Sequence, residues 1–201
     1  INPVRVEVTP QATPIESIEQ SVYYINSKAK GGLLSSLLED KALQRVIVFT
    51  RTKHRANRVA QHLEKSGISA DAIHGNKSQN ARQKALQRFR DGHARVLVAT
   101  DVAARGIDID GVTHVINYEI PNEAESYVHR IGRTARAGAS GFAVAFCDST
   151  ERGYLRDIEK LIKRKLSVVG DEPAPGEFES APEKPQGRGR GGPRNGANSN
   201  A

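Results

Sequence analysis

The chain has 201 residues, a formal net charge of +7 and a single cysteine, Cys147. One cysteine excludes an internal disulfide framework, so we expect a buried, unreactive thiol and a reducing, cytoplasmic setting. No apolar run approaches the length of a membrane span and no signal peptide opens the chain, so we expect no membrane association.

The first 20 residues contain Pro3, Pro10 and Pro14 and are typical of an extended lead-in to a domain. The chain begins at Ile1 and contains no methionine. We therefore expect it to be a piece of a longer protein, with residues 1–20 as a linker.

Residues 21–168 show short apolar runs that alternate with amphipathic stretches. Several runs are continuous, as in strands buried on both faces of a parallel sheet, and the stretches repeat apolar residues at i, i+3 and i+4. This alternation predicts an α/β domain with a mostly parallel central sheet flanked by helices. The expected strands are 22–25, 46–49, 70–73, 96–99, 115–118 and 142–147, and the expected helices cover 33–38, 56–63, 79–90 and a segment from about 123.

Residues 169–201 differ from the rest in composition. From Gly170 onward there are seven glycines, five prolines and one aromatic residue, Phe178. Such a segment cannot bury enough apolar surface to offset its ordering entropy, so we predict a disordered tail. Its charges sum to about −1, which leaves about +8 on the remainder. The positive charge therefore belongs to the domain and is compatible with an anionic partner.

Polar residues follow three expected strands. The second strand ends in Thr50-Arg51-Thr52, the third in His74-Gly75 and the fourth in Thr100-Asp101, and Arg82 lies in the first turn of helix 79–90. Ligands of open parallel sheets collect at the carboxyl ends of strands, and glycine lets backbone amides approach a phosphate. We expect a site for a phosphodiester backbone there, although His74 alone is more typical of a structural histidine.

The segment HRIGRTAR, residues 129–136, is rich in arginine. If it is helical, His129, Arg133 and Arg136 fall at i, i+4 and i+7 on one stripe. A separate apolar stripe, formed by Val128, Ile131 and Ala135, then docks on the sheet. Two fixed guanidinium groups suit an anion with several oxygens, such as a transferring phosphoryl group. The alternative is a solvated basic face paired with Glu123 and Glu125.

A phosphoryl-transfer enzyme needs a loop that cradles phosphates and a carboxylate that binds metal. No G-x-x-x-x-G-K-[ST] motif occurs in this sequence, and no residue is predicted to ligate a metal. The chain therefore has arginines suited to a nucleotide without the elements that would hold its phosphates or magnesium.

Four segments in order resemble the second RecA-like domain of DEAD-box RNA helicases over about residues 20–165. VIVFTRT (46–52) is similar to motif IV, QNAR (79–82) to the Q-x-x-R element, ATDVAARGIDI (99–109) to motif V and YVHRIGRTARAG (127–138) to motif VI. The amino-acid sequences of segments 49–63 and 72–86 resemble those of the bacterial RhlE-like branch most. Ala135 departs from the family, since many relatives have glycine there; from its small size we expect no loss.

The resemblance implies a role for individual residues. Arg133 and Arg136 would be arginine fingers on the γ-phosphate of ATP, Asp108 would contact the ribose, and His129 would link to the acidic motif of the N-terminal RecA-like domain. That absent domain would hold Mg²⁺. Arg105 and Asp101 would organise the interdomain surface. The RNA sugar-phosphate backbone would be held by Thr50, Arg51, Gly75, Arg82, Thr100 and Gly106.

The family mechanism implied is ATP-driven closure of two domains over single-stranded RNA. The isolated chain is then expected to lack ATPase activity and to bind RNA weakly. The alternative is a non-catalytic RecA-like module that binds RNA or a protein, and a DNA helicase of the same superfamily is a further one. The Arg-Gly run at 187–192 either adds nonspecific RNA affinity or belongs to a flexible tether. The sequence does not indicate the oligomeric state.

Overall fold

The computed structural model describes residues 15–105, 111–135 and 140–171. Most of the expected linker 1–20 and of the expected tail 169–201 lies outside the described residues. Within them, no helix is long and apolar enough to cross a membrane. The strands are β1 (Ile18–Tyr24), β2 (Val46–Phe49), β3 (Ala70–Ile73), β4 (Val96–Ala99), β5 (His114–Asn117), β6 (Gly141–Cys147) and β7 (Ser167–Val168). The helices are η1 (Ile15–Ser17), α1 (Lys30–Leu37), α2 (Lys53–Lys65), α3 (Gln79–Arg90), α4 (Asp101–Ala104), α5 (Ala124–Ile131), η3 (Ser149–Glu151) and α6 (Arg152–Ile162).

The strands form one seven-stranded sheet in the order β3-β4-β2-β5-β6-β1-β7, and all its pairings are parallel. This confirms the α/β prediction, and β2, β3 and β4 have the predicted bounds. β1 begins at Ile18, before the expected start of the domain at residue 21. Its buried residues alternate with Glu19 and Ser21, so the sequence there has no continuous apolar run. The short edge strand β7 was not predicted.

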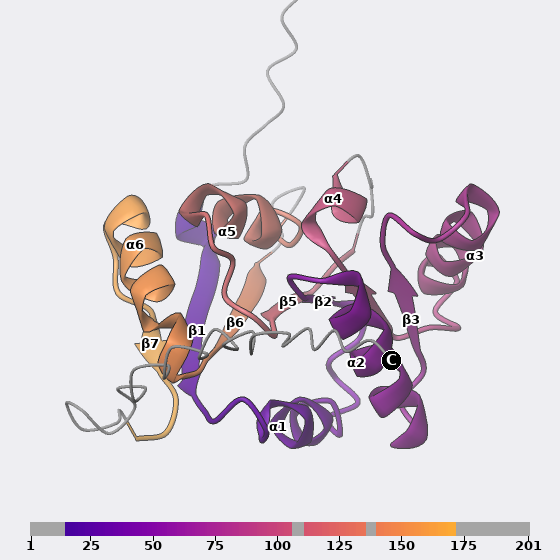
Figure 1. The fold of residues 1–201 in the computed structure, drawn as a ribbon, viewed down its shortest axis with the longest axis horizontal. Helices are drawn as coiled ribbons and strands as arrows, with labels where there is room; N and C mark the ends of the chain where they lie inside the picture. The colour runs from indigo at the N-terminus through magenta and orange to yellow at the C-terminus, as the bar shows by residue number, and fades with distance from the viewer. Residues whose placement is uncertain (1–14, 106–110, 136–139, 172–201) are drawn as a thin grey trace, which may run out of the picture.

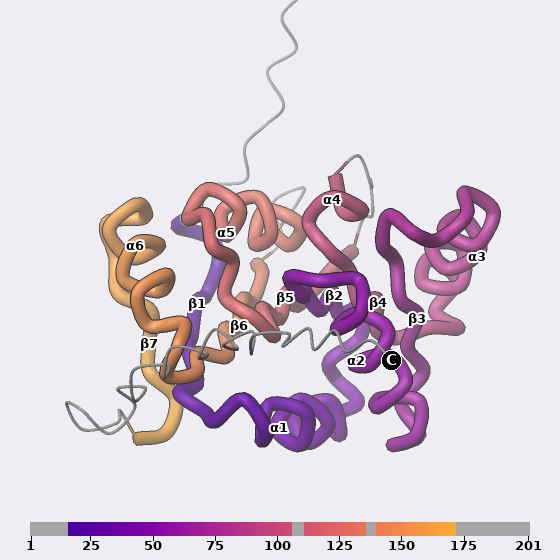
Figure 2. The backbone as a smooth tube through the Cα atoms, viewed as in Figure 1, coloured from indigo at the N-terminus to yellow at the C-terminus, as the bar shows by residue number. Residues whose placement is uncertain are grey.

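Helices cover both faces of the sheet (Figure 1). Apolar residues of α1 and α2 pack with one core cluster, and those of α3, α4, α5 and α6 pack with the other. The tube in Figure 2 shows that β1, from the start of the described chain, lies beside β6 and β7 from its end. The first strand of the chain is therefore an inner strand of the sheet, between β6 and the edge strand β7.

The helix α5 is shorter than predicted. It begins at Ala124, as expected, but ends at Ile131 with Gly132 as its C-cap, so Arg133 does not continue a helical stripe. Arg136 lies outside the described residues. Its buried residues are Ser126, Tyr127, Arg130 and Ile131, whereas the sequence pattern favoured Val128, Ile131 and Ala135. Ile131 and Ala135 are buried in the core as predicted, although Ala135 lies beyond the helix. Val128 is only half-buried, and Tyr127 and the unexpected Arg130 are buried instead.

The segment after α5 is anchored instead by Thr134. This buried hydroxyl lies 2.8 Å from Val112 O and 3.0 Å from Thr113 O. The next residue, Ala135, has φ 55°, in the left-handed region. A side chain there costs about 1 kcal/mol relative to glycine, so the expectation of no loss at Ala135, which considered only size, missed a conformational cost.

Packing against Thr134 requires a glycine at the start of β6. A Cβ at Gly141 would lie 2.5 Å from Thr134 Oγ1 and 2.8 Å from Ala135 N, while a Cβ at Gly153 would meet nothing within 4 Å. We predict that Gly141→Ala lowers the free energy of unfolding by about 2 kcal/mol. The matched control Gly153→Ala should raise it by about 0.5 kcal/mol. Urea unfolding measures both, and equal stability of the two variants would contradict the packing account.

Candidate functional site

Three adjacent strands end level with one another. In the registers, Ile73 pairs with Ala99 and Ala99 with Phe49, so the next residues, His74, Thr100 and Thr50, leave the sheet at the same edge. The prediction that these strand ends converge is confirmed. We call this edge, formed by residues 50–52, 74–75 and 100–101, the strand-end crest.

Not every predicted residue of the crest is presented to solvent. Thr50 is fully buried and its hydroxyl donates to Thr52 O, and Thr100 is nearly buried. The structure therefore argues against a direct contact from the Thr50 side chain. The hydroxyl that lies at the surface belongs to Thr52, which caps α2 by accepting a hydrogen bond from Arg55 N. Sequence analysis placed Thr52 at this strand end but assigned the RNA contact to Thr50.

The crest has a positive electrostatic environment around His74. This histidine is buried, contacts Asn57 Oδ1 through Nε2, and has its pKa lowered by burial and by the nearby charges of Lys77 and Lys53. His74 is therefore neutral at pH 7, as a structural histidine is. The adjacent Gly75 is exposed, so a ligand can approach its backbone.

Arg82 lies at the start of α3, as predicted. Its side chain is half-buried, and its Nη1 donates to Gln79 Oε1. The N-terminus of α3 is capped by Ser78, which accepts from Ala81 N. Arg82 is thus carried by a rigid first turn next to the end of β3.

Arg130 connects the crest to α5. Its side chain is 1% exposed, and its Nε and Nη2 donate to the two carboxylate oxygens of Asp101 at 2.6 and 2.8 Å. Its Nη1 donates to Asn117 Oδ1 and Glu119 O, and its guanidinium lies 5.1 Å from the ring centre of Phe49. One arginine thereby holds the ends of β2, β4 and β5 against α5.

The pair gives Asp101, which was expected to organise the interdomain surface, a role within the domain as well. The charge of Arg130 is neutralised by a bidentate carboxylate. Nothing in the local sequence indicates this pair, because its partners are 29 residues apart.

Arg133 and His129 lie together at the end of α5. Arg133 Nε donates to His129 O, and both residues line a cavity of only about 20 Å³ with Asp101, Arg105 and Arg130. Arg133 is half-buried and follows the C-cap Gly132, while Thr134 after it is anchored. The backbone of Arg133 is therefore fixed on both sides. Small-molecule sites enclose roughly 300 Å³ or more, so this cavity cannot enclose a nucleotide alone.

Three predicted site residues, Gly106, Asp108 and Arg136, lie outside the described residues. Within the described part of the chain, no group of three or more histidine, cysteine or acidic residues could hold a metal ion. Cys147 is buried, and burial raises the pKa of its thiol to about 12. That agrees with the expected inert thiol.

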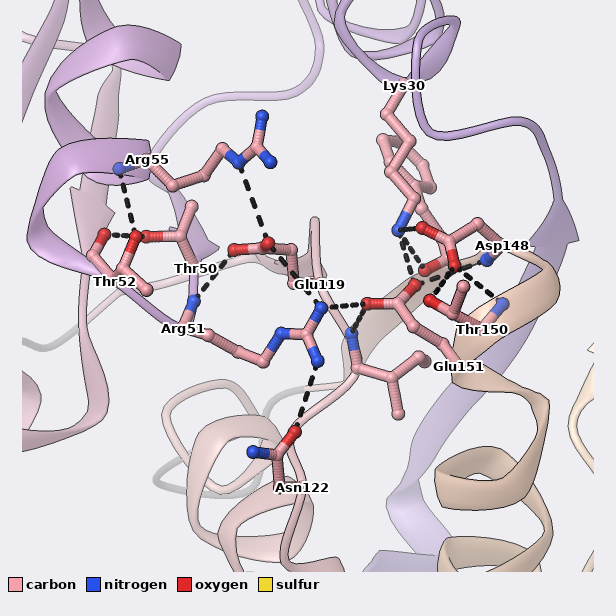
Figure 3. A network of polar contacts seen from close by, with 12 residues as sticks. Lys30, Thr50, Arg51, Thr52, Arg55, Glu119, Asn122, Asp148, Thr150 and Glu151 are labelled. Carbon is pink, nitrogen blue, oxygen red and sulfur yellow. Dashed lines mark hydrogen bonds and ion pairs between the residues drawn. The ribbon is translucent and has the colours of Figure 1, made fainter. Parts of the chain in front are cut away.

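Arg51 belongs to a second polar network (Figure 3). Its Nη1 donates to Asn122 Oδ1, and its Nη2 lies 3.2 Å from Glu151 Oε1 and 3.7 Å from Glu119 Oε1. Its amide also donates to Glu119 Oε2. Arg51 was predicted to bind RNA. In the structure its side chain forms ion pairs with acidic residues of two other loops.

The buried residues of this network escaped sequence reasoning. Lys30, 1% exposed, forms ion pairs with Asp148 and Glu151 at the end of β6. A cavity of about 210 Å³ lies beside it, where loops after β1, β2, β5 and β6 meet. The only sequence signal was the spacing of Asp148 and Glu151, which is that of a capping box. This capping box is present in the structure.

The comparisons with known proteins agree on one family of domains. The model of the helicase conserved C-terminal domain matches residues 29–138, more than half of the chain. ATP-dependent RNA helicase CshA of Listeria monocytogenes is 46% identical over 84% of this chain and 33% of its own length. This chain thus spans about a third of that relative. The name CshA leaves the resemblance to the RhlE-like branch unconfirmed.

Two solved structures are similar in fold. E. coli DEAD-box protein SrmB, bound to regulator of ribonuclease activity A, is 37% identical, with a TM-score of 0.73 over 77% of this chain and 91% of that one. S. cerevisiae Dbp5, bound to RNA and ADP BeF3, is 32% identical, with a TM-score of 0.70 over 76% of this chain and 41% of that one.

The Arg130–Asp101 pair generates a stability prediction. Asp101→Asn removes the charge that pairs with a buried guanidinium and should lower the free energy of unfolding by about 3 kcal/mol. In the control Asp157→Asn, which breaks an exposed pair with Lys160, we expect a change below about 0.5 kcal/mol. Thermal or urea unfolding measures the difference. A loss at Asp101 no larger than that at Asp157 would refute the structural role of the pair.

Proposed function

Because this chain belongs to the family of DEAD-box helicase C-terminal domains, we propose that it forms half of the ATP site and half of the RNA site of an ATP-dependent RNA helicase. The observation that carries the proposal is Arg133, which donates from Nε to the main-chain carbonyl of His129, at a cavity too small to enclose a nucleotide. A site of this kind is completed by a second surface. In this proposal that surface is the N-terminal RecA-like domain of the same parent protein.

Arg133 acts as an arginine finger in this proposal. Its backbone is fixed between Gly132 and the anchored Thr134, so its guanidinium meets the γ-phosphate without a large ordering cost. Arg136 would be the second finger, His129 would contact the acidic motif of the other domain, and Asp108 would hold the ribose. The Mg²⁺ ion that accompanies ATP would be held by the other domain and would neutralise charge on the phosphates.

The strand-end crest holds the RNA backbone in this proposal. The exposed Gly75 offers backbone approach, Arg82 and Arg51 offer guanidinium groups, and the charges of Lys53 and Lys77 surround the same edge. We retain Thr100 and Gly106 as RNA contacts and assign Thr50 a supporting role, since its side chain is buried. The fold similarity to Dbp5, solved with RNA and ADP BeF3, supports an RNA backbone as the ligand.

A non-catalytic module that binds RNA or protein is the alternative. It requires the crest but gives no reason for a rigid arginine beside a half-formed cavity, so we favour the helicase. A cytoplasmic location, the absence of a membrane partner and a place in the RhlE-like branch remain parts of the proposal.

The finger assignment predicts the effect of one substitution in the parent protein. Arg133→Ala should lower RNA-stimulated ATP turnover on the order of 10³-fold, because transition-state charge on the γ-phosphate loses its partner. The melting temperature should stay within a few degrees of the wild type, since Arg133 is only half-buried. Arg156→Ala, on the exposed face of α6, is the control and should leave turnover unchanged. Near-normal turnover in Arg133→Ala would refute the assignment.

The half-site account also predicts the behaviour of the 201-residue chain alone. It should hydrolyse no ATP, with or without single-stranded RNA, because its cavity at Arg133 is incomplete. A phosphate-release assay at a high chain concentration tests this. Hydrolysis that copurifies with the chain and disappears in Arg133→Ala would contradict the proposal.

A further inference from the structure

Glu151 is a fully buried carboxylate that joins four loops at the carboxyl ends of strands. Its Oε1 accepts from Ile120 N, after β5, and lies 3.2 Å from Arg51 Nη2, after β2. Its Oε2 accepts from Asp148 N, after β6, and from Lys30 Nζ at the start of α1. Each oxygen therefore accepts from a backbone amide, which fixes Glu151 independently of Arg51.

Arg51 is the one member of these contacts that reaches the surface. About 31% of its side chain is exposed, compared with 2% for Lys30 and none for Glu151. Figure 3 shows its guanidinium between Glu119 and Glu151, with Asn122 at its other end. Among the described residues, Nη1 and Nη2 have these partners and Nε has none.

We propose that Glu151 is a positioning residue for RNA binding, which orients the Arg51 guanidinium so that its Nε edge meets a phosphate of the RNA backbone. The inference rests on the proposed function, because it takes Arg51 to be an RNA contact. Glu151 touches no RNA itself, since it is fully buried. It acts only through Arg51.

Orientation, and not charge, is what the network supplies. Three cations, Lys30, Arg51 and Arg55, face three carboxylates, Asp148, Glu119 and Glu151, so the cluster as a whole attracts an anion little. An unanchored arginine loses much rotamer freedom when it binds a phosphate. An arginine that is already held end-on by Glu151 and Asn122 has lost that freedom in advance and keeps donors for the ligand.

Glu151 and an RNA phosphate compete for the Arg51 guanidinium, and this competition opposes RNA binding. It is limited because Glu151 engages a single guanidinium nitrogen, through an oxygen that already accepts from Ile120 N. A bidentate pair such as Arg130–Asp101 would instead occupy the fork that binds phosphate. The end-on contact therefore leaves Arg51 able to bind.

A double-mutant cycle on the 201-residue chain tests this. The affinity for a single-stranded 10-nucleotide oligouridylate is measured by NMR titration for wild type, Arg51→Ala, Glu151→Gln and the double variant. We expect Arg51→Ala to weaken binding about five-fold to ten-fold and Glu151→Gln about three-fold to five-fold. The double variant should bind like Arg51→Ala alone, because Glu151 has no route to the RNA except Arg51.

Asp148→Asn is the matched control. Asp148 shares the Lys30 ion pair with Glu151 but has no contact with Arg51 among the described residues, so this variant should lose stability and keep its RNA affinity. If Glu151→Gln does not fold, Asn122→Ala replaces it in the cycle. Asn122 is exposed and holds the other end of the guanidinium, so its loss should also weaken binding only when Arg51 is present.

The outcomes separate this inference from the proposed function. If Arg51→Ala leaves the affinity unchanged, both Arg51 as an RNA contact and its positioning by Glu151 fail. If Arg51→Ala weakens binding but Glu151→Gln leaves it unchanged, strengthens it or weakens it additively, the positioning role is overturned and the RNA contact stands. The same readings apply to Asn122→Ala.

Discussion

The ion pair between Arg130 and Asp101 is the interaction on which the rest of the site depends. A guanidinium in this fully buried place costs free energy unless each donor finds a partner. Asp101, Asn117 and the carbonyl of Glu119 provide those partners, and the ring of Phe49 lies against the guanidinium. The ends of three strands are thereby fixed relative to α5. Arg133 and the strand-end crest, which we assign to different ligands, are held in one rigid frame.

Glu119 joins this frame to the second network. Its carbonyl accepts from Arg130, while its carboxylate accepts from the amide of Arg51 and lies near the Arg55 side chain. Arg130, which lies on α5 just before the proposed finger Arg133, and Arg51, which we assign to RNA, are thus connected through one short loop after β5. This continuity gives a physical basis for the two ligands to affect each other within a single domain, because neither loop can shift without disturbing the other.

The sequence was sufficient for much of the fold because strands buried on both faces have a strong apolar pattern. It gave the bounds of β2, β3, β4 and α3 and the convergence of three strand ends. It failed where side chains behave against their type. Arg130 and Lys30 are charged yet buried, and their carboxylate partners lie far away in the chain, so no local pattern marks them. The end of α5 at Ile131 was missed because Thr134, which anchors the next segment, binds the carbonyls of Val112 and Thr113, which are distant in the chain.

The central claim is that Arg133 belongs to an ATP site whose other half is a second domain. A crystal structure of the parent protein with single-stranded RNA and an ATP transition-state mimic tests it most directly. The account predicts that the Arg133 guanidinium lies about 3 Å from the oxygens or fluorines that represent the γ-phosphate. A closed complex in which the nucleotide is bound and Arg133 remains in contact only with its own domain would contradict the account.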